Sequence, residues 1–94
     1  MTTPPDIRHQ PDRGRFATTV DGHEAELEYR IDDDGFMNIT HVNVPDEIGG
    51  RGIASQLTQA AFEQARTDGL NVRPSCPYAA AWAERHQEFS QLLG

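Results

Sequence analysis

Three glycines directly precede a stretch with helical periodicity, and this arrangement is the one in the sequence best suited to binding a phosphate group. Residues 46–52 hold Gly49, Gly50 and Gly52, and an amphipathic pattern follows from about Arg51. Glycines let backbone N–H groups approach a ligand closely, and a helix start adds unpaired donors and a partial positive charge. The spacing lacks the Gly-Lys-Ser/Thr of a Walker A loop. The glycines alone therefore fit both a phosphate site and a flexible connector.

Cys76 and His41 are the side chains best suited to covalent or proton-transfer chemistry. A cysteine at a helix start is favoured as the nucleophilic thiolate, whereas the alternative for Cys76 is a small buried apolar residue. Imidazole accepts a proton near neutral pH, so His41 is a candidate general base. Because His41 shares a predicted strand face with Met37 and Ile39, the alternative is a hydrogen-bonded core histidine. The residues by themselves leave both pairs of alternatives open.

No metal site is predicted. His41, Cys76 and His86 offer three ligands, but they lack the paired spacing of a zinc site. The acidic turn at 32–34 lacks the spaced ligands and the closing Glu of an EF-hand loop. We therefore expect the acidic turn to be solvated.

The elements that must position these residues form an α+β pattern. Residues 1–14 are rich in Pro, Asp and Arg and are predicted to be a flexible tail, with Ile7 as a candidate strand start and His9 at the surface. Strands are predicted at 15–20, 24–31, 36–44 and 70–73, and helices at about 51–67 and 77–93. The third strand is apolar on both faces and is expected to be buried on both sides. Antiparallel hairpins leading into a right-handed strand–helix–strand crossover give a mixed sheet.

Two segments together resemble the GCN5-related N-acetyltransferases. The first runs from His41 through Pro45 and the glycines to Gly52-Ile53-Ala54 and looks like the acetyl-CoA signature of this family. The second, Pro74-x-Cys76-x-Tyr78, is similar to the small, single-domain YjdJ-type subfamily. The resemblance covers residues 16–93 in the order of the elements.

This resemblance implies that acetyl-CoA crosses the splayed ends of two parallel strands. The thioester would lie near strand 36–44 and Cys76, where an amine attacks it, His41 or water takes a proton, and Tyr78 returns one to sulfur. Tyr78 could instead pack against Trp82, and Cys76 could accept the acetyl group or only shape the pocket. The residues implied to bind the cofactor are Val44, Gly49, Gly50, Arg51, Gly52, Ile53 and Ala54.

The chain departs from the family pattern at two positions. The broad signature begins with Gln or Arg three residues before the central glycine, and this chain has Gly49 there and Arg51 later. The subfamily commonly has an acid two residues after the histidine, and this chain has Asn43, which cannot be a general base. The alternative function is therefore a non-catalytic CoA-binding or protein-interaction module.

The composition favours a cationic acceptor over a nucleic acid. The 94 residues include 15 acidic side chains and 8 basic ones, all arginine, for a net charge of −7. This balance disfavours nucleic acid and anionic membrane and tolerates an amine, either a small molecule or a protein. A single cysteine and the lack of a long apolar run predict a cytoplasmic protein. We expect one domain over residues 15–94, as a monomer or weak homodimer.

Overall fold

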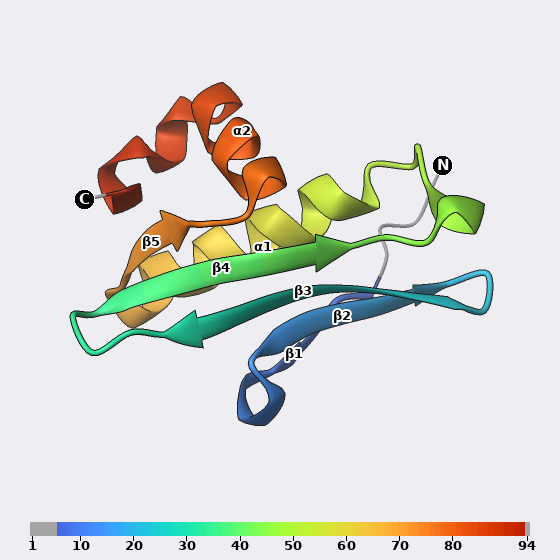
Figure 1. Cartoon of the computed structure of the whole chain (residues 1–94), viewed down its shortest axis with the longest axis horizontal. Helices are drawn as coiled ribbons and strands as arrows, with labels where there is room; N and C mark the ends of the chain where they lie inside the picture. The colour runs from blue at the N-terminus through green and yellow to red at the C-terminus, as the bar shows by residue number, and fades with distance from the viewer. Residues whose placement is uncertain (1–5, 94) are drawn as a thin grey trace.

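Successive antiparallel hairpins and one parallel strand build the sheet. The computed structural model describes residues 6–93, and in it the strands follow one another in chain order, β1-β2-β3-β4-β5 (Figure 1). The strands are β1 (Arg8–Gln10), β2 (Arg15–Val20), β3 (His23–Ile31), β4 (Phe36–Asn43) and β5 (Asn71–Pro74). Neighbouring strands are antiparallel from β1 to β4, and β5 pairs with β4 in parallel. The predicted mixed α+β sheet is confirmed.

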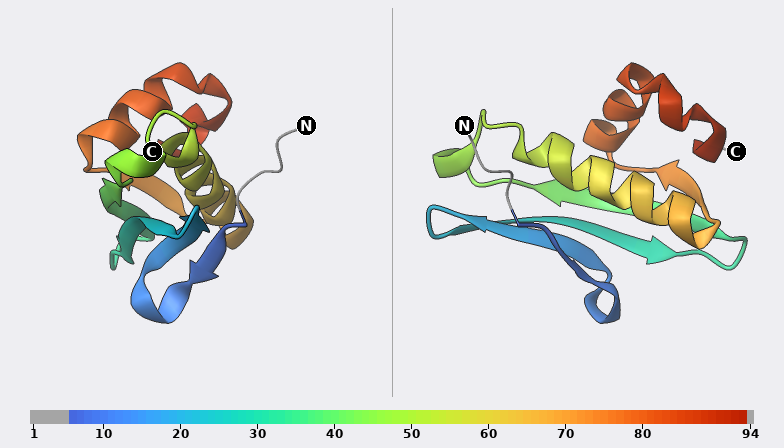
Figure 2. Two further views of the ribbon diagram at one scale, coloured as in Figure 1. Left: turned by 90° about the vertical axis from the view of Figure 1, so that its right-hand side faces the viewer. Right: turned by 180° about the vertical axis from the view of Figure 1, so that it is seen from behind.

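Helices cover one face of the sheet and its β5 edge. The α-helices are α1 (Ile53–Asp68) and α2 (Pro77–Arg85), and the short 3-10 helices are η1 (Pro11–Arg13), η2 (Asp46–Ile48) and η3 (Gln87–Leu93). α1 is the crossover between β4 and β5, while α2 and η3 pack against β5 and α1 (Figure 2). Within residues 6–93, no helix is both long and apolar enough to cross a membrane.

The last helix is shorter than its sequence pattern predicts. A single helix was expected over 77–93, but α2 ends at Arg85 and the chain continues as η3. His86 follows α2 with φ −125° and ψ 72°, outside the helical region. The Nδ1 atom of His86 lies 2.8 Å from the carbonyl oxygen of Trp82, so this side chain occupies an acceptor near the helix end. The expectation of one continuous helix was therefore wrong after Arg85.

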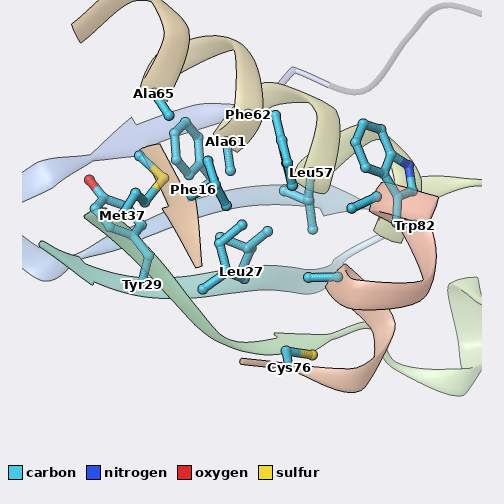
Figure 3. Packing of buried hydrophobic residues seen from close by; sticks show 14 of the residues in the cluster. Phe16, Leu27, Tyr29, Met37, Leu57, Ala61, Phe62, Ala65, Cys76 and Trp82 are labelled. Carbon is cyan, nitrogen blue, oxygen red and sulfur yellow. The ribbon is translucent and has the colours of Figure 1, made fainter. Parts of the chain in front are cut away.

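The buried apolar residues of the sheet and the helices form one cluster. Leu27 of β3 lies below Leu57 and Phe62 of α1 (Figure 3), and all three are fully buried, as is Ala25 in the same cluster. Trp82 of α2 joins them, with its ring centroid 5.0 Å from that of Phe62. Burying each large apolar side chain contributes roughly 1.5–3 kcal/mol. The alternating strand residues and the apolar helix stripe therefore meet in one core.

Strand β1 corrects the prediction of a flexible tail over 1–14. β1 pairs with β2, and His9 lies opposite Phe16. His9 was expected at the surface, but it is half-buried, with its ring stacked 4.2 Å from the Phe16 ring and its Nε2 atom 2.6 Å from the Tyr29 hydroxyl. A strand of three residues is too short to show a period in the sequence. The part of that prediction on residues 1–5 lies outside the described residues.

Candidate functional site

β4 and β5 pair over a short length and then separate. Their register runs from Phe36 opposite Asn71 to Ile39 opposite Pro74. The Cys76 N–H then donates to the carbonyl oxygen of Ile39 at 3.0 Å, and the chain turns away into α2. β4 continues toward the glycine loop paired with β3 but no longer with β5 (Figure 1). The edge of β4 beyond Ile39 is therefore open beside the start of α2, and we call this opening the β4–β5 wedge.

A β-bulge at Thr40 decides which way His41 faces. In the β3–β4 register Tyr29 lies opposite Ile39 and Glu28 lies opposite His41, so Thr40 is the extra residue. One extra residue reverses the alternation of side chains. His41 therefore shares a face with Glu28 and is exposed, and the expectation that it shares a face with Ile39 was wrong. The alternative that His41 is a buried core histidine is therefore wrong. Burial of both faces of β4 was also expected along the whole strand, but it ends at Ile39.

Gly50 and Gly52 give the loop after β4 its shape. Both have φ +76°, a backbone conformation in which other residues are strained. A Cβ on either glycine would meet no atom within 4 Å, so neither glycine is there to make room for a neighbouring part of the chain. Gly49 differs, because its φ is −67° and a Cβ would lie 3.4 Å from the Asp46 carbonyl oxygen. The loop therefore contains two residues in the left-handed backbone conformation, and the space beside the Cα atom of each is free of other protein atoms.

Helix α1 begins with donors but without a capping side chain. Gly52 is its N-cap residue and makes no side-chain cap, and the first bond of the helix runs from the Gln56 N–H to the Gly52 carbonyl oxygen at 3.1 Å. The N–H groups of Ile53, Ala54 and Ser55 precede that bond and have no helical acceptor by position. Such groups and the helix dipole attract anions. The loop and the helix start thus fit the diphosphate of a nucleotide cofactor.

Arg51 is directed toward the hairpin between β2 and β3. Its guanidinium NH1 lies 2.6 Å from Asp21 Oδ2, and the two side chains are 48% and 66% exposed. Pairs this exposed contribute at most about 1 kcal/mol. Arg51 can therefore leave Asp21 at little cost when an anion binds the loop.

The structure brings Cys76 to the β4–β5 wedge and Tyr78 beside it. Cys76 is the N-cap residue of α2, is 8% exposed and belongs to the core cluster (Figure 3). Tyr78 is half-buried and packs against the same cluster. Among the aromatic pairs in the described part of the chain, Trp82 has Phe62, His86 and Phe89 as partners rather than Tyr78. His41 lies further along β4, past the bulge. Candidate reactive residues therefore lie on both sides of the wedge, His41 on β4 and Cys76 with Tyr78 after β5.

A polar network behind Cys76 was not predicted from the sequence. The Ser75 hydroxyl donates to Asn38 Oδ1 at 2.7 Å, and Asn38 Nδ2 donates to Asp32 at 3.3 Å. Arg73 binds Asp32 and also donates to Asp34 at 2.8 Å. The hydrogen bond from Arg73 holds the pKa of the Asp34 carboxyl below its ordinary value. The only sequence signal was the acidic turn, whose partner Arg73 lies about forty residues away along the chain.

A separate hollow of about 350 Å³ lies at the other edge of the sheet. Ile7 and His9 line one side, and Ala60, Glu63 and Gln64 of α1 line the other. β1 and β5 are the two outer strands of the sheet. This hollow is therefore not part of the β4–β5 wedge.

Known proteins resemble the chain in both sequence and fold. Residues 15–92 match a family model described as GCN5-related N-acetyl-transferase. The mouse protein NATD1 is 28% identical over 82 residues, covering 85% of this chain and 74% of its own length. The bovine protein NATD1 is 31% identical over 74 residues, covering 77% and 66%. The solution structure of a GCN5-like protein from Staphylococcus aureus has a TM-score of 0.75 and 29% identity, over 97% of this chain and 89% of that one.

Proposed function

The chain belongs to the GCN5-related N-acetyltransferase family, and from this premise we propose that it binds acetyl-CoA and transfers the acetyl group to an amine. One observation carries the proposal. The edge of β4 that opens beyond Ile39 leads at one end to the glycine loop and lies at the other beside Cys76. An extended cofactor with a diphosphate and a thioester needs an anion site and a reaction site joined by an open edge.

The residues of the loop would hold the cofactor by its diphosphate. Gly50 and Gly52 leave space for the phosphate oxygens, and the N–H groups at the start of α1 would donate to them. Arg51 would add a positive charge near the diphosphate, and Val44 would pack beside the extended body of the cofactor. This local backbone site explains how a chain of net charge −7 can bind an anion.

Acetyl-CoA supplies the activated acetyl group as a thioester, and side chains of the protein would accept and donate the protons that the reaction transfers. The amine nitrogen forms a bond to the acetyl carbon while the carbon–sulfur bond breaks. His41, exposed beyond the bulge, would take the proton that the amine loses. Tyr78 would give a proton to the departing sulfur. The acidic chain favours a cationic amine as acceptor.

Cys76 would line the reaction end of the wedge, either as a covalent carrier or as a pocket wall. Intact-mass measurement after incubation with acetyl-CoA distinguishes the two roles. Because the chain has no lysine, an added acetyl group can reside only on Cys76 or on the N-terminal amine among its strong nucleophiles. An adduct that Cys76→Ala removes assigns the covalent role, and an unmodified chain assigns the pocket role.

Binding of acetyl-CoA tests the proposed function. We expect calorimetry to show binding, and we expect Gly52→Ala to weaken it at least tenfold, because a Cβ strains the φ +76° backbone and enters the phosphate cradle. Gly69→Ala is the matched control, since Gly69 has φ +71° and flanks the far end of α1. No binding of acetyl-CoA at millimolar concentration would contradict the proposal.

Turnover then separates the enzyme from the alternative function. Release of free CoA thiol is measured with a panel of small amines and amine-bearing peptides. Amine-dependent release supports the transferase. Binding without release for any amine would favour the non-catalytic CoA-binding module, for which Asn43 in place of an acid is the supporting observation.

A further inference from the structure

Asn38 is a polar side chain in the buried part of β4. It is 6% exposed and lies between Met37 and Ile39, which both belong to the core cluster. Its Nδ2 atom donates to Asp32 Oδ2 at 3.3 Å, and its Oδ1 atom accepts from the Ser75 hydroxyl at 2.7 Å. A carboxylate can only accept, so Asp32 determines which end of the amide faces Ser75. Asn38 is therefore held in one orientation, with its acceptor directed at the chain after β5.

Asp32 is itself held by two arginines. Arg30 Nε lies 3.2 Å from one carboxylate oxygen, and the Arg73 guanidinium binds the other. The guanidinium carbon of Arg73 also lies 4.2 Å from the centre of the Phe36 ring. Because Arg73 lies opposite Asn38 in the β4–β5 register, these contacts hold the end of β5 against β4. The orientation of the Asn38 amide thus rests on a fixed carboxylate.

Two neighbouring residues of the corner after β5 are bonded to two neighbouring residues of β4. The Ser75 hydroxyl donates to the Asn38 side chain, and the Cys76 N–H donates to the Ile39 carbonyl oxygen at 3.0 Å. A single bond would leave the chain free to pivot about it, whereas two bonds at successive positions fix its direction. Cys76 is the N-cap residue of α2 and Tyr78 lies in the first turn, so this direction sets where both side chains lie at the β4–β5 wedge.

We propose that Asn38 is a positioning residue of the transfer reaction, which fixes the corner at Ser75 and thereby holds Cys76 and Tyr78 in place against the edge of β4. The inference rests on the proposed function, because the reaction that it serves is the acetyl transfer. Asn38 is buried behind the corner, so it acts through Ser75 and not on the cofactor. A displacement of about 1 Å at the reacting groups can lower a rate about a hundredfold. The bond therefore affects kcat, while the proposed diphosphate contacts lie at the other end of the wedge.

Alkylation of Cys76 tests the positioning without a measurement of activity. The chain has one cysteine, so the rate of its modification by iodoacetamide reports on this corner alone. Cys76 is 8% exposed, and its sulfur must become accessible before it reacts. We expect Asn38→Leu, which keeps the branching and removes the amide, to speed the modification roughly two- to tenfold, the effect of one lost hydrogen bond on a local opening. Asn71→Leu, at an exposed asparagine of β5, is the matched control and should react like the wild type.

Steady-state kinetics and calorimetry test the effect on the reaction. We expect Asn38→Leu and Ser75→Ala each to lower kcat for amine acetylation roughly tenfold and to change the Kd for CoA by less than about twofold. The double variant should lose no more than either single variant, because both changes remove the same bond. Ser75→Thr keeps the hydroxyl and should recover most of kcat. Ser90→Ala, at an exposed serine of η3, is the control for Ser75→Ala.

The possible outcomes separate this inference from the proposed function. Ser75 is exposed, so Ser75→Ala carries both measurements if Asn38→Leu does not fold. Alkylation at the wild-type rate, or an unchanged kcat, would overturn the positioning role. Equal losses of kcat and CoA affinity, or additive losses in the double variant, would overturn it too, because the first indicates a general defect and the second a route other than Ser75. A wild type that acetylates no amine would overturn the proposed transfer reaction, while the alkylation rates still decide whether Asn38 fixes the corner.

Discussion

At the scale of single residues, one extra residue in β4 changes the face of the sheet on which His41 lies. Thr40 is the unmatched residue of the bulge, so His41 faces away from α1 and lies opposite Glu28. An imidazole in that position is exposed and can meet an acceptor that approaches the polar face of the sheet. On the other face it would be enclosed by the core.

Replacement of His41 tests its role as the base. We expect His41→Gln to lower kcat for amine acetylation by about a hundredfold at pH 7, which is the lower range for loss of a general base. Acetyl-CoA affinity, measured by calorimetry, should stay the same because His41 lies outside the glycine loop. His23→Gln, at the start of β3, serves as the control and should keep the wild-type rate. An unchanged kcat in His41→Gln would assign proton removal to water.

At the scale of elements, β2 and β3 are linked by a charge network on the face away from α1. Arg15 NH1 lies 2.6 Å from Glu26 and 3.2 Å from Glu24, and the Arg15 side chain is 11% exposed. The hydrogen bond from Arg15 lowers the pKa of the Glu26 carboxyl below its ordinary value, although partial burial of the carboxyl acts in the opposite direction. The pairing therefore favours the folded state when Glu26 is ionised.

The sign of this pKa change predicts how stability depends on pH. A carboxyl whose pKa is lower in the folded state stabilises the fold above its unfolded pKa, and this stabilisation is lost as pH falls through the folded pKa. We expect Glu26→Gln to reduce the free energy of unfolding at pH 7 and to have a smaller effect near pH 3. Urea denaturation at the two pH values measures this. Glu84→Gln on the exposed side of α2 should show no such difference.

The open edge of β4 and the start of α2 meet at the candidate site because β5 is short. β5 has four residues and ends at Pro74, which lacks the N–H needed to continue the parallel ladder. Its separation from β4 was expected from the resemblance to the family, and Pro74 supplies a local cause. Asn38 and Ser75 then hold the corner between β5 and α2 by a hydrogen bond of 2.7 Å.

At the scale of the whole molecule, a small core holds the sheet, α1 and α2 together. Phe62 is fully buried and its ring contacts those of Trp82 and Phe89, so it links α1 with α2 and η3. Domains of this size are stabilised by about 5–15 kcal/mol in total. A single core contact of this kind therefore supports a large part of the stability.

Truncation of Phe62 tests this dependence. We expect Phe62→Ala to lower the free energy of unfolding by about 3–5 kcal/mol. Phe36→Ala is the control, because Phe36 is half-buried and its main ring contact is the Arg73 guanidinium at 4.2 Å. Urea denaturation should show a clearly smaller loss for Phe36→Ala, and equal losses would contradict the central place of Phe62 in the core.

The amino-acid sequence by itself determined the features that depend on neighbours along the chain. The alternation of Ala25 and Leu27, the apolar stripe of α1 and the glycines that require positive φ at 50 and 52 all follow from local preference and periodicity. The sequence of elements from β2 to α2 along the chain and the position of the glycine loop were predicted for this reason. Over residues 6–14 the predicted flexible tail was wrong, because strand β1 and the burial of His9 depend on pairing with β2.

The tertiary structure alone decided the contacts between residues far apart in the sequence. The face of His41 depends on the register of β3 against β4, the corner at Ser75 depends on Asn38, and the hydrogen bond that Ser55 accepts depends on Trp82. A bulge leaves the pattern of hydrophobic residues almost unchanged, although it reverses every side chain that follows it. Local preference therefore fixes which elements form, and their packing fixes which side chains meet.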